Sequence, residues 1–189
     1  MKASNAIVPG SLGAVAKQTG QSLAQTFLSC DVVVLVDTSG SMGSQDSQNG
    51  RSRYDQACIE LANLQECMPG KIGVIAFSSS TMFCPNGKPY NFQGGTNLEG
   101  ALKFAKVADV PGAMKFIVIS DGQPDDGEAA LRVATTYHNK IDVIYCGPEA
   151  YPTGRDFLTR LAKASGGQTI TADKAKDLAS SVQKLLATA

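Results

Sequence analysis

Short oxygen-bearing side chains directly follow an apolar run near the start of the chain. The segment DVVVLVDTSGSMGS begins at Asp31, and its run Val32–Val36 contains only valine and leucine. Such a run is typical of a β-strand buried on both faces. It is followed by Asp37, Ser39 and Ser41, which are each separated by one residue. The sequence therefore predicts a cluster of carboxylate and hydroxyl oxygens at the tip of a buried strand.

Two later segments offer oxygens of the same kind. The apolar run FIVIS ends at Ser120 and is followed by Asp121. The segment FQGGTN places Thr96 after two glycines, which let the backbone approach a neighbour closely. The carboxyl ends of strands in an open parallel sheet meet at one edge, where ligands bind. We therefore expect Asp121 and Thr96 to converge with the segment that begins at Asp37.

The predicted donors are two carboxylates and three hydroxyls, without histidine or cysteine. They are Asp37, Ser39, Ser41, Thr96 and Asp121. Hard oxygen donors do not suit a typical zinc site, whereas they suit Mg²⁺ or Mn²⁺ and, less well, Ca²⁺. The alternative is a helix cap with an anion-binding loop, which two converging carboxylates disfavour. Because the hydroxyls are neutral, we expect modest affinity for the free cation and a remaining attraction for a carboxylate from outside.

The rest of the chain alternates strand-like apolar runs with helical patterns. The predicted strands are Val32–Val36, Lys71–Phe77, Lys115–Ser120, Asp142–Cys146 and Gln168–Thr171. The predicted helices are Tyr54–Cys67, Asn97–Ala108, Glu128–Asn139, Arg155–Ala164 and Ala175–Ala187. This alternation favours a three-layer, doubly wound, Rossmann-like α/β fold whose sheet is mostly parallel. The short run Thr81–Cys84 and the hairpin signal Asn86-Gly87 predict one antiparallel edge strand that reverses on itself.

We expect residues 1–29 to form an amphipathic helical extension and residues 30–189 to form the α/β domain. Five apolar side chains of the extension share one helical face, with an interruption around Gly20. They are Leu12, Val15, Ala16, Leu23 and Phe27. We expect this face to pack on the domain, with binding to a partner as the alternative.

Bulk composition excludes several kinds of partner. The chain has 189 residues, with 17 basic and 17 acidic side chains, so it offers no basic surface for nucleic acid or membranes. No apolar stretch approaches the roughly 20 residues that span a bilayer. The N-terminal segment is too polar for a secretory signal, and the five cysteines include no C-x-x-C pair. These features favour free thiols in a reducing, cytoplasmic setting.

The segment Asp37-Thr38-Ser39-Gly40-Ser41 resembles the Asp-x-Ser-x-Ser motif of the von Willebrand factor A (vWA) domain. Thr96 in GGTN and Asp121 in ISDG resemble the other two elements of its metal-ion-dependent adhesion site (MIDAS). The resemblance extends from Asp31 to the C-terminus. It implies that the two serines coordinate the cation directly, that the threonine is a switchable ligand and that the two aspartates balance the charge.

The same resemblance implies a non-enzymatic module that docks an acidic side chain of a partner protein at its metal. A short chain of this kind resembles stand-alone prokaryotic vWA proteins, which often work with an ATPase or a kinase. We predict that Met42 and Gln123 flank the mouth of the site, next to a variable polar rim at residues 44–53. Asp125 and Asp126 are interpreted as a solvated turn that caps the next helix, with contacts to a partner as the alternative.

Other functions have weaker support in the sequence. One alternative is a structural subunit of a larger assembly that contains a structural metal and docks through its N-terminal helix. A haloacid-dehalogenase-like phosphohydrolase would need a second carboxylate where Ser39 stands. The single histidine, His138, lies in a polar segment, and the chain lacks a G-x-S-x-G elbow and a nucleotide-binding glycine loop.

Overall fold

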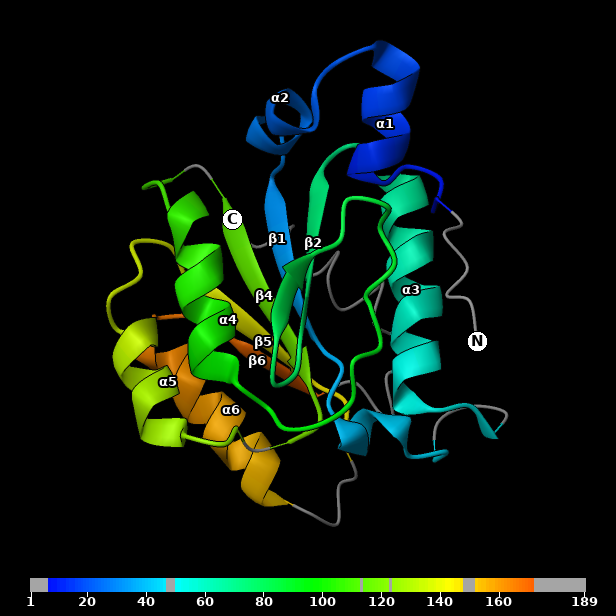
Figure 1. The fold of residues 1–189 in the computed structure, drawn as a ribbon. Helices are drawn as coiled ribbons and strands as arrows, with labels where there is room; N and C mark the ends of the chain where they lie inside the picture. Colours follow the sequence, from blue (N-terminus) through cyan, green and yellow to red (C-terminus); the bar gives the residue numbers. More distant parts are fainter. Residues whose placement is uncertain (1–6, 47–49, 113, 123, 148–151, 172–189) are drawn as a thin grey trace.

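The computed structural model describes residues 7–46, 50–112, 114–122, 124–147 and 152–171. Its strands are β1 (Val32–Asp37), β2 (Ile72–Phe77), β3 (Thr81–Phe83), β4 (Lys115–Ser120), β5 (Ile141–Tyr145) and β6 (Thr169–Thr171). Its α-helices are α1 (Leu12–Thr19), α2 (Leu23–Leu28), α3 (Arg53–Cys67), α4 (Leu98–Ala105), α5 (Gly127–Ala134) and α6 (Pro152–Ala164). Two 3₁₀ turns are η1 (Gly40–Gly43) and η3 (Lys106–Ala108). The sheet lies between helical layers, as Figure 1 shows.

The six strands form one sheet in the order β3-β2-β1-β4-β5-β6. Every pairing is parallel except that of β3 with β2, so the predicted antiparallel edge strand is confirmed. The direction of winding reverses between β1 and β4, which are neighbours in the sheet. In a doubly wound fold, ligands bind at the carboxyl ends of the two strands that flank this reversal.

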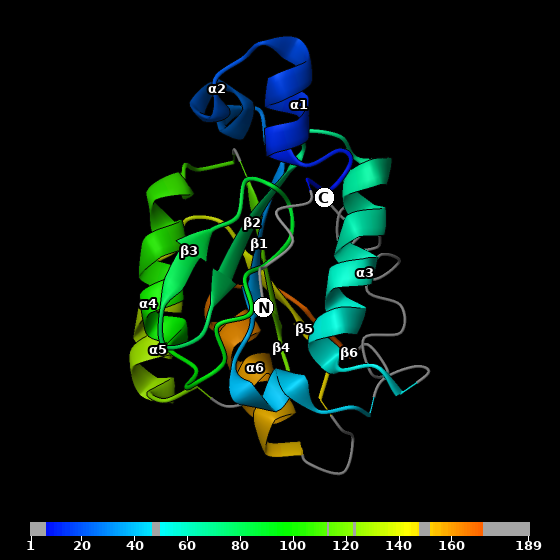
Figure 2. The same ribbon diagram turned by 45° about the vertical axis from the view of Figure 1, so that its right-hand side comes forward.

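The sheet is buried on both faces, and alternate side chains of β1 explain why. Val32, Val34 and Val36 pack in a cluster with side chains of α3. Val33 and Leu35 pack in a second cluster with side chains of α4, α5 and α6. Figures 1 and 2 show α3 on one side of the sheet and the other three helices on the opposite side. The predicted three-layer α/β architecture is confirmed.

The predicted helix Glu128–Asn139 is too long at its C-terminal end. Helix α5 ends at Ala134, and the chain then turns. The carboxylate of Asp109 accepts hydrogen bonds from the backbone N–H groups of His138 (2.7 Å) and Asn139 (3.0 Å). These bonds hold the backbone away from the helical path. The predicted helix Ala175–Ala187 lies outside the described residues.

The Asn86-Gly87 signal forms a turn but no hairpin. Gly87 has a φ of 82°, and its N–H donates to the carbonyl of Cys84 at 2.9 Å. No strand follows this turn in residues 88–97, all of which the structure describes. The carbonyls of Pro85 and Asn86 instead accept hydrogen bonds from the N-terminal segment, at the N–H groups of residues 13 and 8. The turn therefore anchors the start of the chain.

The N-terminal segment forms two short helices that break at Gly20, where φ is 72°. Leu12 and Ala16 of α1 are buried, whereas Leu23 and Leu28 of α2 are 42% and 79% exposed. Helix α1 thus has its apolar face covered, whereas α2 packs on the domain through Phe27, whose ring meets that of Phe83 edge to face. None of the helices in the described part of the chain combines the length and the apolar character needed to cross a lipid bilayer.

Loss of the cap of α1 is expected to destabilise the protein. Ser11 is fully buried, and its hydroxyl accepts the N–H of Ala14 at 3.3 Å. Ser11→Ala should lower the free energy of unfolding by about 1 kcal/mol, measured by urea denaturation. Ser22→Ala is the matched control, because Ser22 caps the exposed end of α2 and its loss should cost less. Equal losses in the two variants would contradict the docking of α1.

Candidate metal centre

Asp37 and Ser120 lie next to each other at the carboxyl ends of β1 and β4. Val36 pairs with Ile119, so Asp37 and Ser120 are neighbours across the strands. The Ser120 hydroxyl donates to Asp37 Oδ2 at 2.6 Å, and the N–H of Ser39 donates to Oδ1 at 2.8 Å. Asp37 is fully buried. Its carboxylate is therefore fixed in orientation by two donors.

Ser39, Ser41 and the Asp121 carboxylate form further hydrogen bonds beside Asp37. The hydroxyl oxygens of Ser39 and Ser41 lie 3.1 Å apart. Ser41 lies in the 3₁₀ turn η1, and its hydroxyl donates to Asp121 Oδ1 at 2.8 Å. The structure thus brings Asp37, Ser39, Ser41 and Asp121 together at the switch point of the sheet. These residues come from two segments that are about 80 positions apart in the sequence.

The loop that carries Thr96 lies against the same tip. Gly40 N–H donates to the carbonyl of Gly94 at 3.1 Å, and Gln93 N–H donates to the carbonyl of Thr38 at 3.0 Å. Gly94 has a φ of 93°, a conformation that glycine adopts without strain. Within the described residues, no hydrogen bond joins the Thr96 hydroxyl to the other four predicted donors. The structure places its loop at the site but leaves its hydroxyl outside the hydrogen-bonded group.

Asp125 holds the Thr96 loop, a role that the interpretation as a solvated turn missed. Its carboxylate accepts the N–H of Thr96 at 3.0 Å, and its own N–H donates to the Thr96 carbonyl at 3.0 Å. A Cβ atom at Gly95 would lie 2.8 Å from the same carboxylate, so a side chain at this position would require the Asp125 carboxylate to shift. Asp126 does cap a helix, because its carboxylate accepts the N–H of Ala129 at 2.9 Å.

Removal of the Asp125 carboxylate should weaken metal binding without unfolding the protein. Asp125→Ala releases the N–H of Thr96, and we expect the dissociation constant for Mn²⁺ to rise about 3- to 10-fold, measured by isothermal titration calorimetry. Asp126→Ala is the matched control at the next position. It should lower stability by about 1 kcal/mol and leave the Mn²⁺ dissociation constant unchanged. An equal effect of both variants on Mn²⁺ would contradict a specific role for Asp125.

Arg53 is the second residue that the sequence did not reveal as part of this site. It was expected to lie in the polar rim, yet it is the first residue of α3 and only 7% exposed. Its guanidinium pairs with Asp121 and with Asp46. Burial lowers the pKa of Arg53, but the two carboxylates outweigh it and the pKa is raised. The positively charged guanidinium of Arg53 therefore lies next to the Asp121 carboxylate of the proposed metal site.

Met42 and Gln123 were predicted to flank the mouth of the site, and the structure describes only the first of them. Met42 is fully buried, and its sulfur lies 3.7 Å from the sulfur of Cys146. It does not flank the mouth of the site, because η1 turns its apolar side chain into the core beneath α3. Gln123 lies outside the described residues.

Burial also disfavours the negative charge of the Asp37 carboxylate. The pKa of Asp37 is raised from its ordinary value of 3.8 to about 6. Desolvation is the main cause, the hydrogen bonds from Ser120 and Ser39 oppose it, and the neighbouring charge of Asp121 adds to it. Placing a negative charge here is therefore costly unless a cation is close.

The donor set fits a hard divalent cation such as Mg²⁺ or Mn²⁺ more closely than it fits zinc. In the described part of the chain, no three His, Cys, Asp or Glu side chains group to hold a metal. A hydroxyl-rich site is expected to lack such a group, because serines supply its ligands. The Ser78 hydroxyl, one residue beyond the carboxyl end of β2, is buried and has no hydrogen-bond partner among the described residues. This edge of the sheet thus offers more oxygen donors than its own hydrogen bonds use.

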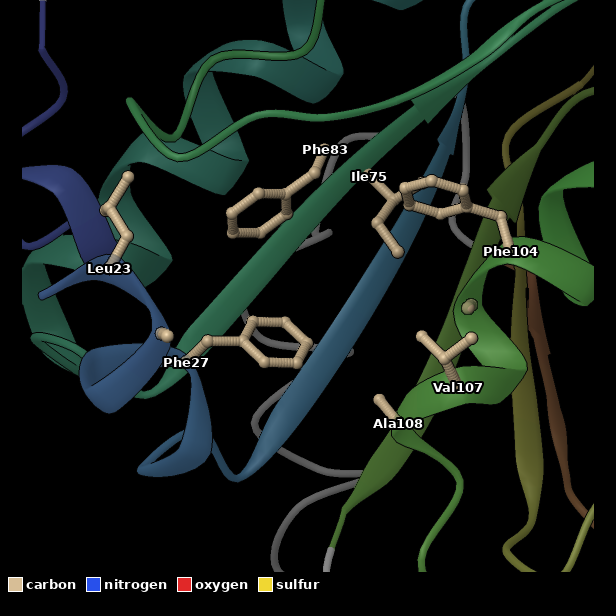
Figure 3. A pocket seen from close by; sticks show the side chains of 9 residues that line it. Leu23, Phe27, Ile75, Phe83, Phe104, Val107 and Ala108 are labelled. Carbon is tan, nitrogen blue, oxygen red and sulfur yellow. The ribbon is translucent and has the colours of Figure 1, made fainter.

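An apolar hollow of about 360 Å³ lies elsewhere, between α2, the edge of the sheet and the end of α4. Figure 3 shows Phe27 of α2, Phe83 of β3 and Phe104 of α4 around it. All of its lining side chains are apolar, so it offers no group for metal binding or acid–base chemistry.

Comparison with solved structures identifies the fold. A variant of an aerotolerance-related membrane protein from Bacteroides fragilis, with multiple mutations to serine, superposes with a TM-score of 0.65 at 18% identity, over 85% of this chain and 100% of that one. A von Willebrand factor type A structure from Catenulispora acidiphila gives 0.65 at 17% identity, over 84% of this chain and 42% of that one. Manganese-loaded TRAP protein from Plasmodium vivax gives 0.57 at 17% identity, over 83% and 73%. No family profile and no curated protein sequence matches the chain.

Proposed function

From the von Willebrand factor A fold of this chain, we propose a non-enzymatic module that binds another protein through a divalent cation. The carrying observation is the hydrogen-bonded group of Ser39, Ser41 and Asp121 beside Asp37 at the switch point. These donors match the chemistry of Mg²⁺ or Mn²⁺. A manganese-loaded neighbour of the same fold adds support for this choice.

Each residue has a proposed role at the cation. Ser39 and Ser41 would bind it directly through their hydroxyl oxygens. Asp37 and Asp121 would balance its charge, and Thr96 would enter or leave as its loop moves. When bound, the cation supplies an electrophilic position that accepts a carboxylate. An acidic side chain of the partner protein would fill that position.

Several features argue against catalysis by these residues. The position that a phosphohydrolase would fill with a second acid is occupied by Ser39. Asp37, which stands where such an enzyme has its nucleophile, is fully buried and has both oxygens hydrogen-bonded. An attacking carboxylate needs a free, accessible oxygen.

The setting is proposed from the cysteines and from resemblance. All five cysteines are free thiols, as expected in a reducing compartment such as the cytoplasm. We propose an ATPase or a kinase as the partner, by analogy with prokaryotic vWA proteins that work with such enzymes. We also propose that the α/β domain begins at residue 30 and that residues 1–29 form an extension to it.

Partner capture in the presence and absence of chelator tests this function. The tagged protein should retain a partner from extracts of its native source in Mg²⁺ and lose it in EDTA. The Asp37→Ala variant should fail to retain that partner in either condition. Retention of the same partners in all samples would contradict metal-dependent recognition.

A structural subunit remains the second candidate, and the exposed apolar surface of α2 favours it. Leu23 is 42% exposed beside the apolar hollow, and Val107 across it is 86% exposed. Surfaces of this kind often contact another protein. If this candidate is correct, chelation should lower the melting temperature but leave assembly intact. The proposed metal-dependent module should instead lose its partner.

A further inference from the structure

Both oxygens of the Asp121 carboxylate are engaged by side chains of the protein itself. Oδ1 accepts the Ser41 hydroxyl at 2.8 Å, and Oδ2 accepts an N–H of the Arg53 guanidinium. The Asp121 side chain is 0% exposed. A cation at the serine hydroxyls therefore has to compete with these donors, or displace one of them, to bind Asp121 directly.

Arg53 is fixed strongly enough to resist such displacement. Its Nε and Nη2 atoms donate to the two oxygens of Asp46 at 2.9 and 2.6 Å, a paired geometry of high directional specificity. Its backbone N–H donates to the carbonyl of Ser44 at 3.1 Å. The Arg53 side chain is 9% exposed, so water cannot readily replace Asp121 as its partner. Arginine also keeps its charge when buried, because its pKa is so high.

These contacts define what Arg53 does once a cation is bound. We infer that Arg53 is a positioning residue that keeps Asp121 out of direct contact with the metal. This inference rests on the proposed metal-dependent function. The Ser41 hydroxyl can coordinate through its oxygen while its proton still points at Asp121. The metal position that Asp121 does not fill is left to water or to the partner's carboxylate.

The inference predicts opposite effects on the cation and on the acid that binds to it. The positive charge of Arg53 repels a divalent cation and cancels the charge of Asp121. The same charge attracts an incoming carboxylate. Arg53 thus lowers the affinity of the site for the cation and leaves the bound cation more attractive to a carboxylate. This combination suits a site that binds a partner protein rather than one that stores a metal.

Mn²⁺ provides the test, because its paramagnetism reports both binding and bound water. The Arg53→Met variant keeps the aliphatic bulk and removes the charge. We expect its Mn²⁺ dissociation constant to fall about tenfold, measured by electron paramagnetic resonance. Water proton relaxation should show one fewer water on the metal, because Asp121 now binds it. Arg51→Met is the matched control, since Arg51 is exposed and carries the same charge.

A second variant keeps the test decisive if Arg53→Met does not fold. Asp121→Asn retains an oxygen acceptor for Ser41 and leaves Arg53 paired with Asp46. We expect it to keep the wild-type number of metal-bound waters. A gain of one water in Asp121→Asn, or unchanged affinity and hydration in Arg53→Met, would overturn the inference. Absence of Mn²⁺ binding to the wild-type protein would instead overturn the proposed function itself.

Discussion

Asp37→Asn is expected to raise the dissociation constant for Mn²⁺ at least about 100-fold at neutral pH while the protein stays folded. The substitution removes the negative charge of Asp37, whereas the charge of Asp121 is already paired with Arg53. It retains the shape of the side chain and an oxygen that can accept the N–H of Ser39. Ser120 can turn its hydroxyl to accept from the new amide. Isothermal titration calorimetry would measure the loss.

The same substitution should stabilise the metal-free protein. Burial raises the pKa of Asp37 from 3.8 to about 6, a difference that corresponds to roughly 3 kcal/mol against the ionised form above pH 6. An amide avoids this cost, so the melting temperature without metal should rise. A substitution is expected to raise stability and abolish binding together when the binding site contains a buried charge that destabilises the metal-free protein.

Asp31→Asn is the matched control for this experiment. Asp31 precedes the same strand at its opposite end, is exposed and pairs with Lys71 at 3.2 Å. Its loss should leave both Mn²⁺ affinity and melting temperature nearly unchanged, because exposed ion pairs contribute little. If Asp37→Asn bound Mn²⁺ as well as Asp31→Asn does, Asp37 would not belong to a metal site.

The strands were predictable because a strand that is buried on both faces has a continuous run of apolar residues in the sequence. A run such as Val32–Val36 cannot be exposed on either side, so it indicates a central parallel strand. Because parallel strands end at one edge, the position of Asp37 and Asp121 after such runs also predicted their meeting. The structure brings these carboxylates together through Ser41, as the strand ends required.

The roles of Arg53 and Asp125 were not predictable, because side-chain pairing across loops leaves no periodic pattern. A charged residue in a polar segment looks the same whether it faces water or a buried carboxylate. Arg53 is the first residue of α3, and its guanidinium is buried against Asp121 and Asp46 rather than exposed in the polar rim. The error at Met42 has a related cause, since the direction of η1 decides which of its side chains enters the core.

The pH dependence of metal binding should follow the ionisation of Asp37. The cation binds the carboxylate form, and this form is depleted as the pH falls through about 6. Between about pH 7.5 and about pH 4.5, the Mn²⁺ affinity should therefore fall about 30-fold from this group alone. Calorimetry at pH 5 in buffers of different ionisation enthalpy should detect the released proton, and at pH 7.5 that release should be absent.

The stability of the metal-free protein should change with pH in the opposite direction. The pKa of Asp37 is higher in the folded protein than its ordinary value of 3.8, so the folded state binds the proton more tightly. Its contribution to stability is then greatest below pH 3.8, declines as the pH rises toward about 6 and is constant above that. Saturating Mn²⁺ should remove this decline by holding the carboxylate ionised. If the Asp37→Asn variant showed the same decline between pH 4 and 6 as the wild-type protein, another group would be responsible and Asp37 would not couple folding to metal binding.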